Sequence, residues 1–225
     1  MKIAIIGTAG RKDDADRLDR GAYLWMCDAV RKIIDVELGL GRSTVDLISG
    51  GAAYADHVAV TLFLNREVNS LHLALPCAWD VEKQTYRDSG VFDWRTNPGG
   101  TSNHLHRAFS AKVYPSIHNA SLNEIDLAIG LGASTGTGNG FFDRNLYIAN
   151  QADVVIAFTF GNGAVLKDGG TADTVGKYEA SCKKQPRANP PTVFHGNLLE
   201  REVYRLKVLH PVESPSFVDS FYATD

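Results

Sequence analysis

The stretch KIAIIGTAGR, residues 2–11, decides the fold. After the first lysine it is a short apolar run rich in β-branched residues, as in a strand that is buried on both faces, and a glycine turn follows at once. Four further runs have the same character: Val45–Ile48, Leu71–Leu75, Asp153–Phe158 and Thr192–His195. Helical patterns separate most of them, which indicates parallel strands joined by crossover helices. We therefore predict a Rossmann-like three-layer α/β sandwich with a mostly parallel five-stranded sheet.

Apolar residues at helical spacing predict where the helices lie. They are expected at Asp16–Leu38, Ala52–Leu64, Phe142–Gln151 and Ala172–Lys184. The segment Pro76–Gly140, after the third strand, is far longer than a usual strand–helix connection. It predicts an insertion at about residues 77–140.

The insertion itself holds one predicted helix and two Gly-rich segments. Ser121–Gly130 is expected to be helical, with Ser121 and Glu124 forming a capping box. Thr96–Ser102 and Gly132–Gly140 are polar and rich in glycine, and we expect them to be flexible.

Composition bounds the class of protein. The 225 residues are 44% hydrophobic, enough for one domain over residues 1–225, with a tail at 197–225 whose alternation at Val203–Val208 suggests an edge strand. A net charge of −3 argues against nucleic acid as the partner. No apolar run is long enough to span a membrane, and the run before Gly7 is too short for a signal peptide. Three scattered cysteines suit a reducing compartment, so we expect a cytoplasmic protein.

Three of the predicted strands end in turns made of small residues. Ligands of doubly wound sheets bind at the carboxyl ends of the strands, where glycine lets backbone N–H groups approach an anion and helix N-termini add partial positive charge. Each turn alone fits a simple tight bend, because neither GxGxxG nor a P-loop is matched. Together they favour a phosphate-lined crevice for a small-molecule nucleotide. The candidate residues in these turns are Gly7, Thr8, Ala9 and Arg11, then Ser49, Gly50, Gly51 and Asp56, and finally Gly169, Gly170, Thr171 and Thr174.

In their order and spacing these motifs resemble the SLOG superfamily of Rossmann-like nucleotide-binding proteins. That superfamily includes the LOG phosphoribohydrolases and the DprA-type DNA-processing proteins. The matching runs are IIGT at 5–8, ISGGA at 48–52 with Ala55-Asp56, Arg144-Asn145 ahead of NQADVVIAF, and GGT at 169–171. The resemblance implies a nucleotide ligand and, for LOG enzymes, cleavage of an N-glycosidic bond by a glutamate and an arginine.

The sequence departs from the LOG pattern at several positions, and an insertion, Thr159–Lys167, displaces its double glycine. Arg144 falls on the family's arginine, but Asn145 replaces its lysine and Asp168 its proline. Counted from the double glycine, the family's threonine falls on Asp173 and its catalytic glutamate on Gly176. The run GGTADT is closer to uncharacterised phage and bacterial members. The resemblance supports a nucleotide pocket more strongly than LOG catalysis.

Cleavage of an N-glycosidic bond needs a carboxylate to stabilise the developing positive charge or to activate water. The carboxylates that could reach the strand edge are Asp56, Asp168, Asp173 and Glu179. Of these we take Asp173, with Arg144 as the phosphate ligand, as the catalytic candidates, although Asp173 fits a helix cap equally well. Asp56 is expected to order the crevice, Glu179 to be a surface charge, and Asn145 to bond ribose or a loop.

The insertion also carries His104 and His106, whose spacing disfavours a shared helix face. No cluster completes a ligand set, so we expect no metal and no cofactor. The nearby Phe92, Trp94 and Phe109 suit either base stacking or, the interpretation we favour, a satellite core under a long loop.

Three functions remain open from the sequence. The first is an N-glycosidase or phosphoribohydrolase that acts on a nucleoside monophosphate or related nucleotide. The second is a non-catalytic binder that sequesters a nucleotide signal. The third is a DprA-like DNA-binding module, which the net charge disfavours. A homodimer is compatible with the apolar content of the tail.

Overall fold

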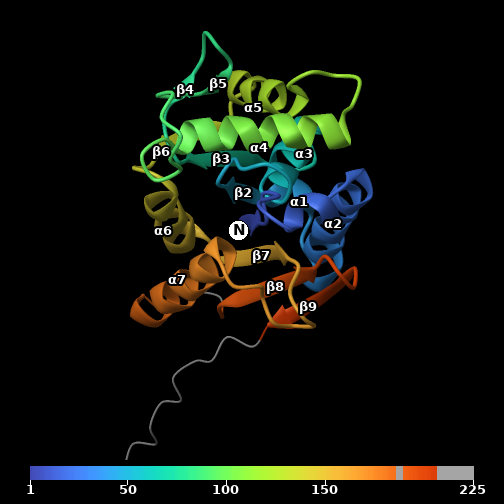
Figure 1. The fold of residues 1–225 in the computed structure, drawn as a ribbon. Helices are drawn as coiled ribbons and strands as arrows, with labels where there is room; N and C mark the ends of the chain where they lie inside the picture. The colour runs from blue at the N-terminus through green and yellow to red at the C-terminus, as the bar shows by residue number, and fades with distance from the viewer. Residues whose placement is uncertain (186–189, 207–225) are drawn as a thin grey trace, which may run out of the picture.

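The computed structural model describes residues 1–185 and 190–206, which form a three-layer α/β structure around one large sheet (Figure 1). Within the described residues the sheet has seven strands in the order β6-β3-β2-β1-β7-β8-β9, parallel except for β9, which pairs antiparallel with β8. The strands are β1 (Lys2–Gly7), β2 (Asp46–Ser49), β3 (Ser70–Leu75), β6 (Ser134–Thr137), β7 (Val154–Thr159), β8 (Thr192–Asn197) and β9 (Glu202–Leu206). This confirms the predicted fold class.

Alternation along the central strands explains the three layers. In β1, Ile3 and Ile5 face one hydrophobic core, whereas Ala4 and Ile6 face another on the opposite side of the sheet. The first core packs against α2 (Arg20–Lys32), α3 (His57–Leu64), α4 (Pro98–Val113) and α5 (Ala120–Gly130). The second packs against α6 (Phe141–Gln151) and α7 (Gly170–Lys184). In Figure 1, α3, α4 and α5 lie together at the top, and α6 and α7 lie at the left and lower left.

The predicted five-stranded sheet is too small by two strands. All five predicted strands are present, and β6 and β9 extend the sheet at its two edges. Strand β6 lies within the Gly132–Gly140 segment that we expected to be flexible. It is mostly exposed and polar, so it carries no apolar pattern, and its pairing with β3 is what holds it. Strand β9 confirms the edge strand as far as Leu206; positions 207 and 208 lie outside the described residues.

Two helix starts differ from the sequence expectations. The predicted Asp16–Leu38 helix is instead a short α1 (Asp14–Arg17), then α2, and then a π-helical turn over Ile33–Glu37. Asp19 ends the preceding segment and caps α2 by accepting a hydrogen bond from the Ala22 N–H at 2.7 Å. The predicted Ala52–Leu64 helix begins only at His57, because the residues before it form the turn after β2.

Inside the insertion, most of the segment Thr96–Ser102, which we expected to be flexible, forms the start of α4 at Pro98. Asn97 accepts a hydrogen bond from the Gly100 N–H, and Pro98 occupies the first helical position of α4. The Ser121–Glu124 capping box is wrong as well. Helix α5 follows Asn119, and the Ser121 side chain bonds to His106 and Ser110 on α4. The rest of the insertion holds a small hairpin of β4 (Trp79–Asp80) and β5 (Thr85–Tyr86). Outside the insertion, a 3₁₀ turn at Arg42–Thr44 precedes β2.

Among the described residues, no helix has both the length and the apolar character that crossing a membrane requires.

Candidate functional site

The strand order reverses between β1 and β7, and a cavity of about 490 Å³ lies at their carboxyl ends. Chain connections leave β1 toward β2, β3 and β6 on one side and resume with β7 on the other, which is where doubly wound sheets open a crevice. The cavity walls come from the turn after β1, the loop before α3, helices α4 and α6, and the loop between β7 and α7.

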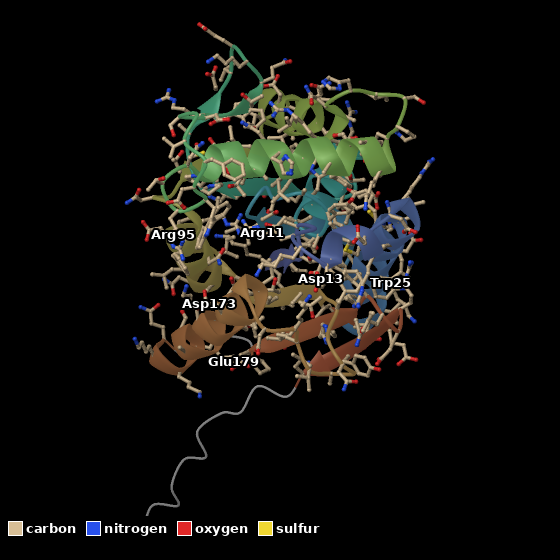
Figure 2. The ribbon with its side chains drawn as sticks, viewed as in Figure 1. Arg11, Asp13, Trp25, Arg95, Asp173 and Glu179 are labelled. Carbon is tan, nitrogen blue, oxygen red and sulfur yellow. The ribbon has the colours of Figure 1, made fainter. Side chains whose placement is uncertain are left out.

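Most of the residues predicted from the sequence lie together in this cavity. The predicted residues that line it are Gly7, Thr8, Ala9, Arg11, Asp56, Arg144, Asn145, Gly169, Gly170, Thr171 and Thr174. Ser49, Gly50, Gly51 and Asp173 are not among the lining residues. Asp173 is exposed on α7 and pairs with Lys177 at 2.7 Å, and Glu179 is on the same helix. Figure 2 shows Asp173 and Glu179 on the α7 side of the molecule, away from Arg11.

The turn after β2 lies behind the cavity wall and needs both of its glycines. A Cβ on Gly50 would lie 2.6 Å from Asp56 Oδ2 and 2.7 Å from Arg144 Cζ. Gly51 has a φ of +63°, a left-handed conformation that favours glycine. Ser49 ties the turn to the next helix because its hydroxyl donates to the Asp56 carbonyl at 2.8 Å. This turn therefore shapes the cavity wall. Ala52 and Ala53, which follow the turn, line the cavity.

Asp56 is a buried carboxylate that joins two of the glycine turns. Its Oδ1 accepts a hydrogen bond from the Gly7 N–H at 3.2 Å, and its Oδ2 accepts one from the Gly50 N–H at 3.1 Å. Burial raises the pKa of this carboxyl, and Arg144 and the backbone N–H groups of its neighbours oppose that rise. These bonds hold the turn after β1 against the turn after β2.

Two arginines share one aromatic ring at the cavity wall. The guanidinium carbons of Arg11 and Arg144 lie 4.8 Å and 5.3 Å from the centroid of Phe141. Desolvation lowers the pKa of Arg11, and the positive charge of Arg144 lowers it further. Within residues 1–185 and 190–206, neither guanidinium forms an ion pair with a carboxylate. Two neighbouring positive charges thus line the cavity without a salt bridge to either, and the buried Asp56 carboxylate acts electrostatically on Arg144.

Asn145 fixes the orientation of Arg144. Its Oδ1 accepts hydrogen bonds from Arg144 Nε at 3.1 Å and from Arg144 Nη2 at 2.9 Å, and Arg144 Nη1 donates to the Gly50 carbonyl at 3.2 Å. The Asn145 amide also lies 3.5 Å from the Gly170 carbonyl at the start of α7. Gly169 precedes that helix and offers no side-chain cap, so the first N–H groups of α7 are open beside the cavity.

The opposite wall is tied together by Asp14 and Lys167, which the sequence analysis did not single out. Asp14 accepts hydrogen bonds from Thr8 Oγ1 at 2.7 Å and from Lys167 Nζ at 2.6 Å. This ion pair joins the start of α1 to the loop that follows β7. Thr159, at the end of β7, accepts from the Lys167 N–H at 3.1 Å and contacts the buried His195 Nε2 at 2.9 Å. The other acidic residues that line the cavity are Asp13, Asp56 and Asp168.

The insertion supports the turn after β2 from behind. The Gly51 carbonyl accepts hydrogen bonds from His106 Nε2 at 2.9 Å and from the Tyr86 hydroxyl. Both donors are fully buried. Burial, together with a smaller contribution from His57, lowers the pKa of His106 to about 3, so His106 is neutral and its Nε2 carries the donated proton.

The aromatic residues of the insertion separate into different environments. Phe109 is part of the main core and not of a satellite core, and Phe92 is fully exposed. Trp94 packs against Phe141 and Phe142 at the start of α6. His104 is exposed and His106 is buried, so the two do not share a face. In the described part of the chain, no three His, Cys, Asp or Glu side chains are grouped so that they could hold a metal ion.

The fold and the cavity together define a Rossmann-like α/β protein with a candidate ligand site where its strand order reverses. The chain is 35% identical over 185 residues to "Uncharacterized protein R261" of Acanthamoeba polyphaga mimivirus, a match that covers 81% of this chain and 93% of the viral protein. The chain therefore belongs to the same protein family as this mimivirus protein. No protein-family model matches the chain, and no solved structure matches it.

Proposed function

We propose that the protein binds a nucleoside monophosphate or a related nucleotide, with the phosphate held between Arg11 and Arg144. The observation that carries this proposal is the pair of guanidinium groups on Phe141, which line the cavity and form no salt bridge with a carboxylate among the described residues. Bringing two positive charges together costs free energy unless an anion compensates them. Guanidinium groups bind phosphate bidentately, so a phosphate suits the position between them.

The start of α7 supports the same ligand class. Its open N–H groups carry the partial positive charge of a helix N-terminus, and Gly169, Gly170 and Thr171 line the cavity beside Asn145. The cavity volume of about 490 Å³ lies within the range of small-molecule sites. A sugar phosphate with an attached base is the corresponding ligand.

The carboxylates of the lining favour hydrolysis of the N-glycosidic bond as the activity. Asp168 and Asp13 line the cavity, and neither forms an ion pair within the described residues, whereas Asp14 is neutralised by Lys167. A free carboxylate near the sugar would stabilise an oxocarbenium-like transition state or activate a water molecule. In this proposal the catalytic carboxylate is Asp168, in place of Asp173, which was predicted from the sequence.

A ligand panel tests the binding proposal. Ribo- and deoxynucleoside monophosphates should raise the melting temperature, and a ligand at 100 times its Kd adds about 2.7 kcal/mol of stability. Arg11→Met and Arg144→Met should remove this stabilisation. Arg107→Met is the matched control, because Arg107 is exposed on α4 and does not line the cavity. Folded protein that no nucleotide stabilises contradicts the proposal.

Chromatography of the same mixtures tests the activity. Free base released by the protein and lost in Asp168→Asn supports N-glycosidic hydrolysis. Tight binding without release of base from any nucleotide leaves the protein as a nucleotide-sequestering binder.

A further inference from the structure

Three aromatic rings form a cluster at one side of the cavity, and they come from two distant parts of the chain. Trp94 belongs to the insertion, and its ring centroid lies 6.3 Å from that of Phe141 and 6.0 Å from that of Phe142. Phe141 also lines the cavity, so it connects the two arginines with Trp94. Phe142 is 61% exposed, which leaves this cluster open to solvent at the start of α6.

The loop that carries Trp94 is well organised. Asn97 is only 5% exposed, and its amide donates to Asp88 Oδ1 at 2.7 Å and to the Val91 carbonyl at 2.8 Å. Its Oδ1 accepts hydrogen bonds from the N–H groups of Ser89 and Gly100. These bonds close the segment from 88 to 97 into a compact loop. Trp94 is not itself a lining residue, and it is connected to the cavity through its ring contact with Phe141. A ring that is already held in place loses little entropy when a ligand stacks on it.

Positive charges lie on the faces of the cluster. The Arg95 guanidinium is 4.5 Å from the Trp94 centroid, and Lys177 Nζ is 5.5 Å from the Phe142 centroid. Figure 2 shows Arg95 at the left of the molecule, where α6 lies, and Arg11 nearer its centre. Aromatic rings with cations on their faces are the surfaces on which proteins stack nucleobases beside phosphates.

We propose that Trp94 stacks on the base of the nucleotide whose phosphate lies between Arg11 and Arg144. This inference rests on the proposed function and adds that Trp94 of the insertion recognises the base. The guanidinium group of Arg95 stacks on one face of the indole ring, which shows that this face accepts a flat partner. Because Arg95 is exposed, its side chain can move aside and a base can take its place. Base recognition then belongs to the insertion, and phosphate recognition belongs to the Rossmann-like core.

Calorimetric titrations of the full chain with a nucleoside monophosphate, with ribose 5-phosphate and with inorganic phosphate test this inference. The unsubstituted protein should bind the nucleotide more tightly than ribose 5-phosphate. Trp94→Ala should weaken nucleotide binding by roughly 5- to 150-fold, as expected for the loss of one base–aromatic stack, and should leave binding of ribose 5-phosphate unchanged. Trp94→Phe should restore most of the affinity. Phe92→Ala is the matched control, because Phe92 lies in the same loop but is fully exposed and makes no aromatic contact with the described residues.

The outcomes separate this inference from the proposed function. Equal affinity of the unsubstituted protein for nucleotide and ribose 5-phosphate overturns the base-stacking inference and leaves phosphate binding intact. A loss in Trp94→Ala that is equally large for both ligands, or that Phe92→Ala reproduces, overturns it as well, because the effect is then one of loop structure. Failure of all three ligands to bind overturns the proposed function and the inference with it.

Discussion

Arg11 and Arg144 direct their guanidinium groups at the same phenyl ring, although one follows the first strand and the other lies in the sixth helix. Each charge disfavours the other, and the lowered pKa of Arg11 reflects desolvation together with the charge of Arg144. An anion that lies between the two charges would relieve this repulsion.

Arg11→Met is therefore expected to separate stability from binding. Removing one of two repelling charges should leave the free energy of unfolding unchanged or slightly higher, while nucleotide affinity falls at least about tenfold through loss of a charge-assisted contact. Arg144→Met should lose affinity and also stability, because Arg144 bonds to Asn145 and to the Gly50 carbonyl. Chemical denaturation and calorimetry on both variants provide the comparison, and equal destabilisation of the two would contradict it.

Gly50→Ala should destabilise the protein, because the new Cβ would lie 2.6 Å from Asp56 Oδ2 and 2.7 Å from Arg144 Cζ. The cost of such overpacking is about 1–3 kcal/mol, and the displaced Arg144 should weaken nucleotide binding as well. Gly176→Ala is the matched control, because Gly176 is a helical residue of α7 whose added Cβ meets nothing within 4 Å. That control should stabilise by about 0.5–1 kcal/mol. A neutral Gly50→Ala in denaturant titrations would show that the turn can relax.

Stability should fall in acid partly through His106. Its pKa is about 3 in the folded chain and about 6.5 when unfolded, so below pH 6.5 the unfolded state binds a proton that the folded state does not. The His106 contribution is complete above pH 6.5 and is lost as the pH falls toward 3, at up to about 1.4 kcal/mol per unit. His106→Asn should be less stable at neutral pH and should show a flatter decline between pH 6.5 and 4. Identical slopes in denaturation curves of the two proteins would contradict this assignment.

Asp173→Asn should leave nucleotide binding and any release of base unchanged. Asp173 is exposed, and within the described residues its ion pair is with Lys177, a helical i, i+4 pair worth about 0.3–0.5 kcal/mol. Asp168→Asn changes a carboxylate that lines the cavity. Side-by-side turnover assays of these two variants decide between the carboxylates, and a loss confined to Asp173→Asn would return the catalytic role to α7.

The central strands were predictable because they are buried on both faces and therefore carry continuous apolar runs, as in Asp153–Phe158. Strand β6 was not predictable, because its serine, threonine and glycine residues are typical of a loop. Only its pairing with β3, which the local sequence does not indicate, makes it a strand. The start of α4 was missed for a related reason. Its glycines suggested flexibility, although Asn97 followed by Pro98 is a helix-start signal that the sequence already contained.

The site was predictable where backbone turns form it and less so where tertiary packing does. Gly7, Thr8 and Gly170 follow strands or begin a helix, so their position at the sheet edge follows from topology. Nothing local indicates that Phe141 lies under two arginines, or that Lys167 reaches across to Asp14. Those contacts depend on how α6 and the loop after β7 pack, and the sequence pattern does not contain that information.

The Gly51 carbonyl is held by Tyr86 and His106, both of which lie in the insertion, and Phe109 from the same segment is part of the main core. A shortened chain that connected β3 directly to α6 would strip that carbonyl of both donors and open a hole above α3. The insertion is therefore part of the folded core. A shortened protein that lacks it should expose apolar surface and aggregate.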